Sequence, residues 1–429
     1  MLVAKSIHFV GVGGVSMSAL IRLARDMGAQ VSGSDSRFSP TLAKLLEEGY
    51  DVYAGCRPEM ARSADLVVYT GAVPPTNPEL QAASRLMERS EFLGEIARGF
   101  EIVIGVAGTH GKTTSAAYLA SILEAARLPF TAHIGGEVVG YGSGYRRTGD
   151  RILVTEACEY REHFLALRPT VGIVTNVEYD HPDYYRTPDQ LYRAFGRYAE
   201  SAEALVCPTE VSECIGADMH RCLYDDMCIR PVPEGGDAWV YMDRCSSIQV
   251  CLPTWGAFNA YDACLAIRAA RVIGVDEEAI KLGVASFSGV KRRQQVLGRL
   301  HGAPLITDYA HHPTEIRALL EEARKRFGRL CVVFQPHTYS RTEGLMAEFA
   351  TCFEEADTLY ILPTYAARET GDEQVVVNLE RAIKKADKHL VGPEQLVEIL
   401  KKPCGKYNAY LLVGAGDVND LAQMLPLGD

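Results

Sequence analysis

The sequence of 429 residues predicts an α/β protein built from three domains. The chain is too long for one ordinary hydrophobic core. Short apolar, β-branched segments alternate with amphipathic or Ala/Leu-rich segments, which is typical of parallel strands connected by helices. Glycine-rich turns follow a predicted strand in each third of the chain. We therefore expect domains at residues 1–97, 98–289 and 290–429.

Composition excludes several classes of protein. The chain is 47% hydrophobic and 23% charged, as ordered globular proteins are. Its net charge of −11 argues against binding to nucleic acid or to an acidic membrane surface. We see no apolar segment of membrane-spanning length and no signal peptide, and so expect no membrane insertion and a cytoplasmic location.

The 12 cysteines include no C-x-x-C pair. In the cytosol we expect the cysteines to be reduced and buried, where they pack like small hydrophobic residues. A metal cluster among Cys207, Cys214, Cys222 and Cys228 is rejected, because the spacing fits no zinc pattern.

The first predicted domain begins with a strand at 5–10, the turn Gly11-Val-Gly-Gly-Val-Ser16, a helix at 17–27 and a strand at 30–34 that ends at Asp35. This order is typical of dinucleotide-binding βαβ units, in which an acidic residue follows the second strand. Ser16 replaces the third glycine, so a purely structural turn is the alternative. A helix at 40–48, a strand at 65–69 and a helix at 78–87 complete a mostly parallel sheet.

The second predicted domain contains the sequence Ile104-Gly-Val-Ala-Gly-Thr-His-Gly-Lys-Thr-Thr-Ser115, between a strand at 100–104 and a helix at 115–126. Gly108 and Gly111 permit a tight turn whose N–H groups face an anion at the helix N-terminus. Lys112 would reach the β- and γ-phosphates of a nucleotide, and the hydroxyl of Thr113 would bind Mg²⁺. Val106 occupies the position of the first glycine of the strict phosphate-loop pattern, so a structural turn remains the alternative.

Two further strands of this domain, 151–155 and 170–175, end at polar residues. Because parallel strands end at one edge of a sheet, we expect Glu156, Asn176, Asp180 and His181 to converge on the phosphate loop. Glu156 suits Mg²⁺, and His181 suits a second metal or a substrate. We interpret Cys158 as structural, 133–145 as a substrate loop and 233–236 as a hinge.

The third predicted domain follows a helix at 257–273, in which Asn259 either caps the first turn or faces a base. A basic link at 288–293 leads to strands at 295–300, 304–308, 330–334, 357–362 and 409–413, with helices at 314–326 and 378–386. Two strand-end loops carry histidine and proline, Asp308-Tyr-Ala-His-His-Pro313 and Gln335-Pro-His337. Such loops are suited to close over a neighbouring active site.

These motifs together resemble the Mur ligases of peptidoglycan synthesis. The resemblance covers essentially the whole chain, and Val106 is the form of the phosphate loop that the family uses. It implies a Rossmann-like UDP-binding first domain, a P-loop ATPase-like central domain and a Rossmann-like α/β third domain. The segments that carry it are 8–17, 107–114, 176–181, 289–293, 308–313, 335–342 and 414–416.

The resemblance also implies an activity. A family member would use ATP and Mg²⁺ to join L-alanine to the lactyl carboxylate of UDP-N-acetylmuramate through an acyl phosphate. It would act as a monomer or weak homodimer. The implied catalytic residues are Lys112, Glu156, His181, His311 and Arg341.

The implied binding residues form four groups. ATP would contact Gly108, Thr109, His110, Gly111, Lys112, Thr113, Thr114, Asn259 and Arg293. The UDP-sugar would contact Gly11, Gly13, Gly14, Ser16, Asp35, Ser36 and Thr70. The amino acid would contact His311, His337 and Arg341. One Mg²⁺ would be held by Thr113 and Glu156, and His181 would help to hold a second.

The sequence departs from the family pattern at a few positions. Residues 191–197 lack the lysine that sibling ligases carbamoylate, which fits the alanine-adding branch. Cys158 replaces an aspartate, Phe258 a histidine and Thr338 a common arginine, so the amino-acid carboxylate depends more on Arg341. Segment 207–255 is shorter than usual.

Three alternatives stay open at this stage. One is a recycling ligase that adds a preformed peptide to the same sugar nucleotide. Another is a catalytically silent nucleotide-binding scaffold. An NAD-dependent dehydrogenase is the weakest, because it leaves Gly111-Lys112-Thr113 unexplained. The choice among alanine, glycine and serine also stays open.

Overall fold

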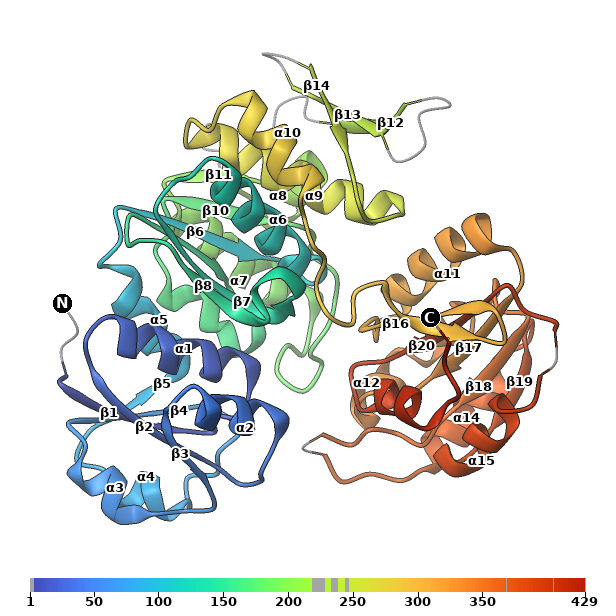
Figure 1. The fold of residues 1–429 in the computed structure, drawn as a ribbon, viewed down its shortest axis with the longest axis horizontal. Helices are drawn as coiled ribbons and strands as arrows, with labels where there is room; N and C mark the ends of the chain where they lie inside the picture. Colours follow the sequence, from blue (N-terminus) through green and yellow to red (C-terminus); the bar gives the residue numbers. More distant parts are fainter. Residues whose placement is uncertain are drawn as a thin grey trace. The chain divides into compact units, whose positions relative to one another are not determined.

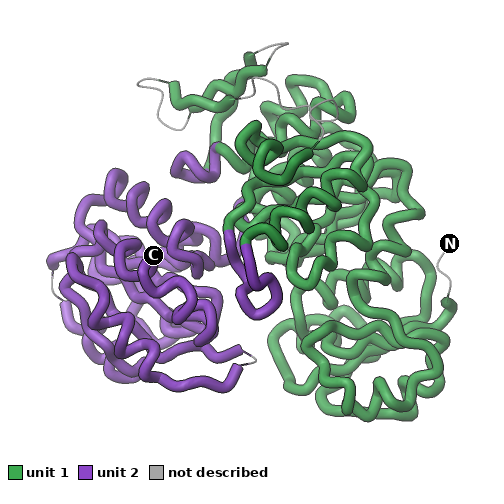
Figure 2. Tube along the Cα trace, turned by 180° about the vertical axis from the view of Figure 1, so that it is seen from behind, with its two compact units in different colours: residues 1–178, 188–253, 261–288 green, residues 179–187, 254–260, 289–429 purple. Residues whose placement is uncertain are grey.

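The fold is described from a computed structural model (Figure 1) over residues 4–217, 228–232, 238–243, 247–367, 369–403 and 405–428. The expected hinge at 233–236 and Cys222 lie outside these residues. The chain divides into two compact units (Figure 2). Unit 1 comprises residues 1–178, 188–253 and 261–288, and unit 2 comprises 179–187, 254–260 and 289–429. Each unit is described by itself.

The first sheet of unit 1 is fully parallel, in the order β3-β2-β1-β4-β5. The predicted parallel sheet is therefore confirmed. The predicted helix at 78–87 is wrong in its second half, because Leu86 and Met87 pair with Val67 and Val68 in the sheet. The strands are β1 (Ser6–Val10), β2 (Gln30–Asp35), β3 (Asp51–Ala54), β4 (Leu66–Tyr69) and β5 (Leu86–Glu88), and the helices are α1 (Val15–Asp26), α2 (Pro40–Glu47), α3 (Pro58–Ser63), α4 (Pro78–Ala82) and α5 (Arg89–Ala97).

The second sheet of unit 1 has the order β11-β10-β6-β9-β7-β8, and only the β7–β8 pair is antiparallel. The expected substrate loop at 133–145 is corrected here, because most of it belongs to the paired strands β7 and β8 at the sheet edge. The strands are β6 (Ile102–Ala107), β7 (Phe130–Val138), β8 (Ser143–Arg147), β9 (Ile152–Glu156), β10 (Val171–Val174) and β11 (Ala204–Val206). The helices are α6 (Lys112–Ala125), η1 (Val139–Tyr141), η2 (Tyr160–Ala166), α7 (Pro188–Ser201), α8 (Thr209–Ile215), α9 (Ala257–Val272) and α10 (Glu277–Ala285).

Segment 207–255 contains a small antiparallel sheet of β12 (Cys228–Pro231), β13 (Ala238–Met242) and β14 (Ser247–Cys251). The expectation that the cysteines are buried is only partly right. Among the described cysteines, Cys207, Cys264, Cys331 and Cys352 are buried, whereas Cys56, Cys214 and Cys251 are exposed.

Unit 2 contains a sheet in the order β15-β16-β20-β17-β18-β19, parallel except for the β15–β16 hairpin. Alternate residues of β17 face two separate cores, Val332 and Phe334 in one and Cys331 and Val333 in the other. Both faces are thus buried, as expected of parallel sheets. The strands are β15 (Gln295–Leu300), β16 (Ala303–Asp308), β17 (Leu330–Phe334), β18 (Thr358–Ile361), β19 (Asp387–Leu390) and β20 (Ala409–Val413). The helices are α11 (Pro313–Phe327), α12 (Tyr339–Gly344), α13 (Met346–Phe349), α14 (Gln374–Ala382), α15 (Pro393–Leu400) and η3 (Val418–Met424).

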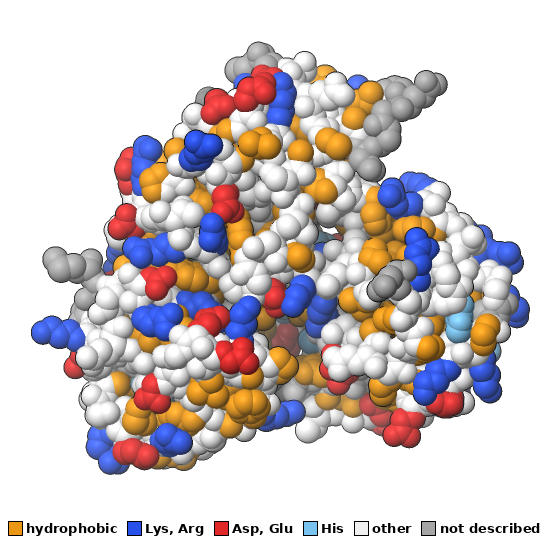
Figure 3. Space-filling view, viewed as in Figure 1, with side chains coloured by type: hydrophobic (Ala, Val, Ile, Leu, Met, Phe, Trp, Pro, Cys, Tyr) orange, Lys and Arg blue, Asp and Glu red, His pale blue; other side chains and the backbone are white. Residues whose placement is uncertain are grey.

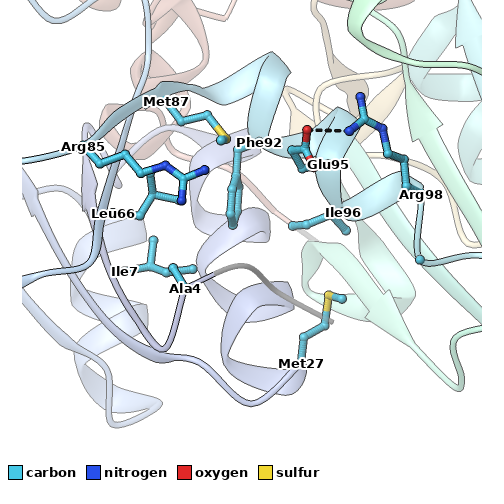
Figure 4. A pocket seen from close by; sticks show the side chains of 11 residues that line it. Ala4, Ile7, Met27, Leu66, Arg85, Met87, Phe92, Glu95, Ile96 and Arg98 are labelled. Carbon is cyan, nitrogen blue, oxygen red and sulfur yellow. Dashed lines mark hydrogen bonds and ion pairs between the residues drawn. The ribbon is translucent and has the colours of Figure 1, made fainter.

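Two surface features complete the description. A cavity of about 180 Å³ lies in unit 1, where Leu66, Met87 and Phe92 contribute apolar side chains and Glu95 forms an ion pair with Arg98 (Figure 4). On the face drawn in Figure 3, acidic and basic side chains are interspersed and do not gather into one basic area. None of the described helices is both long enough and apolar enough to span a membrane.

Candidate active site

The phosphate loop connects β6 to α6 through two glycines with positive φ, Gly108 at 137° and Gly111 at 80°. A Cβ on Gly108 would lie 1.8 Å from Thr175 Oγ1, and one on Gly111 would lie 2.2 Å from Asp262 Oδ1. Only glycine therefore fits at either position. The N-cap of α6 is Gly111, which has no side chain to cap the helix, and the N-terminus of a helix is suited to an anion. This geometry fits a nucleotide phosphate.

The end of β10 holds this loop in place. The Asn176 side chain accepts a hydrogen bond from His110 N (2.9 Å) and donates one to His110 O (3.1 Å). Thr109 Oγ1 donates to Glu178 O at 3.0 Å, and His110 Nε2 lies 2.9 Å from Glu178 Oε2. The expected approach of Asn176 to the phosphate loop is thus present in the structure, and these hydrogen bonds hold the loop in shape.

Lys112 lies at the start of α6, and its ammonium is held by Glu159. Nζ donates to both carboxylate oxygens of Glu159, at 2.8 and 3.1 Å, and to the loop carbonyls of Gly108 and Thr109. Burial by itself would lower the pKa of Lys112, but the negative charge of Glu159 outweighs it and raises the pKa. Lys112 is therefore a fixed cation beside the loop. Glu159 was not among the predicted site residues; the only signal in the sequence was its place three residues after Glu156.

The neighbouring Cys158 is a thiol rather than a nucleophilic thiolate. Burial raises its pKa, and the charge of Glu159 raises it further. This agrees with the structural interpretation of Cys158.

Oxygen donors suited to Mg²⁺ stand on two elements near this loop. Glu156 is the last residue of β9, in register with Val106 of β6, and its Oε1 accepts a hydrogen bond of 2.6 Å from Gly135 N. Thr113 contributes a hydroxyl from the first turn of α6. A carboxylate and a hydroxyl are ligands that this hard cation prefers, so Thr113 and Glu156 fit the group. Thr114 is buried in the same turn.

The seven residues predicted to contact a UDP-sugar gather at the carboxyl ends of β1, β2 and β4. Gly11 has a φ of 91°, and Gly14 is the N-cap of α1. Asp35 Oδ2 accepts a hydrogen bond from Gly13 N at 2.8 Å. Ser36 lies beside Asp35 and Thr70 beside Gly11. Asp35 therefore orders the glycine turn itself.

A buried polar cluster in the same sheet was not predicted from the sequence. Glu79 is fully buried and accepts hydrogen bonds from Tyr53 OH (2.9 Å), Ser34 Oγ (2.5 Å) and Arg57 N (2.9 Å). His8 Nε2 lies 3.4 Å from Glu79 Oε1. Burial would raise the pKa of Glu79, but these hydrogen bonds outweigh it and lower the pKa to about 2. The cluster ties β1, β2 and β3 to α4.

In unit 2, one group brings together Asp180, His311, His337 and Arg341. Arg341 pairs with Asp180 through two hydrogen bonds, and its Nη1 lies 3.2 Å from His337 Nδ1. The His337 and His311 rings are 5.8 Å apart between centroids. The three residues predicted to contact the amino acid are therefore neighbours.

The electrostatics of this group are well defined. Burial, together with the positive charge of Arg341, lowers the pKa of His311 to about 3 and that of His337 to about 4. Burial would raise the pKa of Asp180, but His181 and Arg341 outweigh it and keep Asp180 ionised. His181 donates its backbone N–H to Asp180 Oδ1 at 2.7 Å. Since Asp180 and His181 belong to unit 2, their convergence with Glu156 on the phosphate loop stays a prediction.

The residues predicted near the adenosine, Asn259 and Arg293, also lie in unit 2. Asn259 Nδ2 donates to Trp255 O and to Gln294 Oε1, each at 2.8 Å. The Arg293 guanidinium lies 5.0 Å from the centre of the Tyr309 ring. The adjacent Arg292 donates to Gly414 O and Gly416 O, which fixes the glycine turn after β20.

Three family models match the chain in order. They are described as "Mur ligase family, catalytic domain" over residues 6–101, "Mur ligase middle domain" over 106–207 and "Mur ligase, glutamate ligase domain" over 292–416.

Curated relatives match over nearly the whole length. The UDP-N-acetylmuramate–L-alanine ligases of Acetivibrio thermocellus and Lachnospira eligens are each 35% identical over 98% of this chain, and the match covers 95% and 97% of their own lengths. Among solved structures, the UDP-N-acetylmuramate–alanine ligase of Thermotoga maritima is 25% identical, with a TM-score of 0.79 over 98% of this chain and 97% of that one. The murein peptide ligase of Psychrobacter arcticus shares the fold, with a TM-score of 0.75 at 23% identity over 98% of each chain.

Proposed function

The chain belongs to the Mur ligase family, and from this premise we propose that it is an ATP-dependent ligase joining L-alanine to the lactyl carboxylate of UDP-N-acetylmuramate. The observation that carries the proposal is the match of 35% identity over 98% of the chain to alanine-adding relatives. The organised phosphate loop around Lys112 supports the use of ATP, because a fixed cation at that place suits the phosphates of a nucleotide.

The first step activates the carboxylate. A lactyl carboxylate oxygen attacks the γ-phosphorus of ATP, the bond from phosphorus to the bridging oxygen breaks, and ADP leaves. The N–H groups of the loop and the Lys112 ammonium stabilise the charge on the phosphates. Mg²⁺, when bound, neutralises phosphate charge, and Thr113 and Glu156 would hold it. We propose His181 as the ligand of a second ion.

The second step forms the amide. The amine of L-alanine attacks the carbonyl carbon of the acyl phosphate, loses a proton, and inorganic phosphate leaves. We propose that Arg341, oriented by Asp180, binds the carboxylate of the amino acid. His311 Nδ1–H donates to Tyr309 O at 3.0 Å, which leaves the neutral Nε2 lone pair to accept a hydrogen bond from the amine and orient it. Because the pKa of His311 is lowered to about 3, the proton itself passes to the departing phosphate.

The test is phosphate release from ATP with Mg²⁺ and UDP-N-acetylmuramate, with L-alanine, glycine, L-serine or the tripeptide added separately and product masses recorded. We expect release that depends on L-alanine and a product heavier by one alanyl residue. Release with the tripeptide alone would make the protein a recycling ligase, and no release with any amine would leave a binding protein. A cytoplasmic location and a monomer or weak homodimer stay predictions.

A further inference from the structure

One buried histidine of unit 1 has no part in the proposed reaction. His133 lies in β7 and is 2% exposed. Its Nδ1 lies 2.9 Å from Thr155 Oγ1 in β9, and its Nε2 lies 3.0 Å from Ser16 Oγ and 3.2 Å from Ser16 O in α1. The imidazole ring of His133 thus connects α1, which follows β1 of the first sheet, to β9, a central strand of the second sheet.

Both ends of this connection touch a predicted binding residue. Ser16 follows the Gly13-Gly14 turn and belongs to the residues predicted to contact the UDP-sugar. Thr155 is fully buried and directly precedes Glu156, the predicted metal ligand. Gly135, two residues beyond His133 on β7, donates its N–H to Glu156. The same strand therefore fixes Thr155 and Glu156 together.

Two backbone carbonyls surround the ring's hydrogen bonds. Ser16 O lies 3.2 Å from Nε2 and can only accept, and Glu156 O, which also only accepts, lies 3.2 Å from Thr155 Oγ1. When the ring proton is on Nε2, Nδ1 accepts from the Thr155 hydroxyl; when it is on Nδ1, the ring donates to Thr155 Oγ1 and the Thr155 hydroxyl donates to Glu156 O. Arg89 Nη1 donates to Ser16 Oγ, at 3.1 Å. In the Nε2 tautomer two donors are directed at Ser16 Oγ, so the Ser16 hydroxyl proton can be donated to a substrate oxygen.

The ring is neutral under ordinary conditions. Burial, assisted by the positive charge of Arg89, lowers the pKa of His133 to about 4. The charge of the ring is therefore the same across the pH range in which such an enzyme is assayed.

We propose that His133 is a positioning residue that couples the UDP-sugar turn to the metal and nucleotide site. The inference rests on the proposed function, since it takes a sugar nucleotide as the ligand of the turn. A diphosphate oxygen that accepts the Ser16 hydroxyl proton fixes Ser16, and the ring then fixes Thr155 and with it Glu156. Occupation of either site strengthens binding at the other, by the same factor in both directions.

The experiment measures the dissociation constant of a non-hydrolysable ATP analogue with Mg²⁺, with and without UDP-N-acetylmuramate. The reverse titration, and titration of UDP-N-acetylmuramate without metal, complete the set. For the unmodified protein we expect a coupling factor of about 5–150. In Thr155→Val, which removes one hydroxyl at nearly constant volume, and in His133→Phe, the factor should fall toward one. The coupling factor of the double variant should be no lower than that of either single variant.

Asp26→Ala is the matched control. Asp26 ends α1 and accepts a hydrogen bond of 2.7 Å from Tyr145 OH in β8, so it also ties α1 to the second sheet. It lies about 15 Å along the helix from Ser16, at 1.5 Å per residue. We expect its coupling factor to match that of the unmodified protein.

The outcomes separate the two proposals. An unmodified protein that binds both ligands with a factor near one contradicts the coupling but not the ligase function. The coupling is equally contradicted if Thr155→Val keeps the full factor, or if Asp26→Ala loses it to the same extent. An unmodified protein that does not bind UDP-N-acetylmuramate contradicts the proposed function, and with it this inference.

Discussion

Arg341 and Asp180 form a two-point ion pair, with Nε 3.1 Å from Oδ1 and Nη2 3.2 Å from Oδ2. Both side chains are nearly buried, at 9% and 7% exposure. The pair fixes the plane of the guanidinium beside His337. In the proposed reaction, this plane determines where the carboxylate of the amino acid binds.

Asp180→Asn should destabilise the protein and raise the KM for L-alanine more than the KM for ATP. Removing one partner of a buried pair leaves an uncompensated charge and costs about 3–5 kcal/mol. Urea unfolding and steady-state kinetics check both effects. Asp180→Asn combined with Arg341→Met should unfold at a higher urea concentration than the sum of the single effects implies. Additive effects would show that the pair is not coupled.

Lys112→Met should lower kcat by about 10²–10³-fold, because one fixed donor to the transition-state charge is lost. The thermal midpoint should also fall, because Lys112→Met leaves the carboxylate of Glu159, whose side chain is only 4% exposed, without its cation. Lys281→Met is the control: Lys281 pairs with Glu277 on the surface of α10. If Lys112→Met and Lys281→Met had the same kcat, Lys112 would have no part in the reaction.

Gly111→Ala should lower turnover by about 10²-fold, because its Cβ would lie 2.2 Å from Asp262 Oδ1 and displace the loop from its working geometry. Gly49→Ala provides a matched control. Gly49 has nearly the same φ, 79° against 80°, but an added Cβ there meets no atom within 4 Å. Gly49→Ala should cost about 1–2 kcal/mol of stability through φ strain alone and keep full turnover.

Stability should fall in acid partly through Glu79. Its folded-state pKa of about 2 lies below the ordinary value of 4.5, so its contribution is complete above pH 4.5 and is lost as the pH falls toward 2. The size of this contribution is up to about 3 kcal/mol at neutral pH. Denaturant unfolding at several pH values should show a shallower acid loss in Glu79→Gln than in the unmodified protein. Parallel curves would contradict this assignment.

The sequence was informative where chemistry depends on local order. The positions of Gly108, Gly111 and Lys112 predict a phosphate loop, because the strand, the turn and the helix are consecutive in the chain. The parallel sheets were predictable for the same reason. Strand β5 was not predictable from the sequence, since Leu86 and Met87 continue a helical pattern and only pairing with β4 makes them a strand.

Contacts between distant segments could not be predicted. Glu159 and Lys112 are far apart in sequence, and nothing local indicates that one buried carboxylate holds the other residue's ammonium. The same holds for Glu79 with His8, and for His133 between Ser16 and Thr155. Buried polar groups need partners, but the identity of each partner is a property of the fold.

The most direct test of the proposed reaction follows the oxygen atoms of the substrate. UDP-N-acetylmuramate carrying heavy oxygen in its lactyl carboxylate is incubated with ATP, Mg²⁺ and L-alanine, and the inorganic phosphate is analysed by mass spectrometry. The acyl phosphate route predicts that each phosphate formed carries one heavy oxygen and that the other stays in the amide. Phosphate without heavy oxygen would show that the carboxylate never attacked ATP, and would contradict the account.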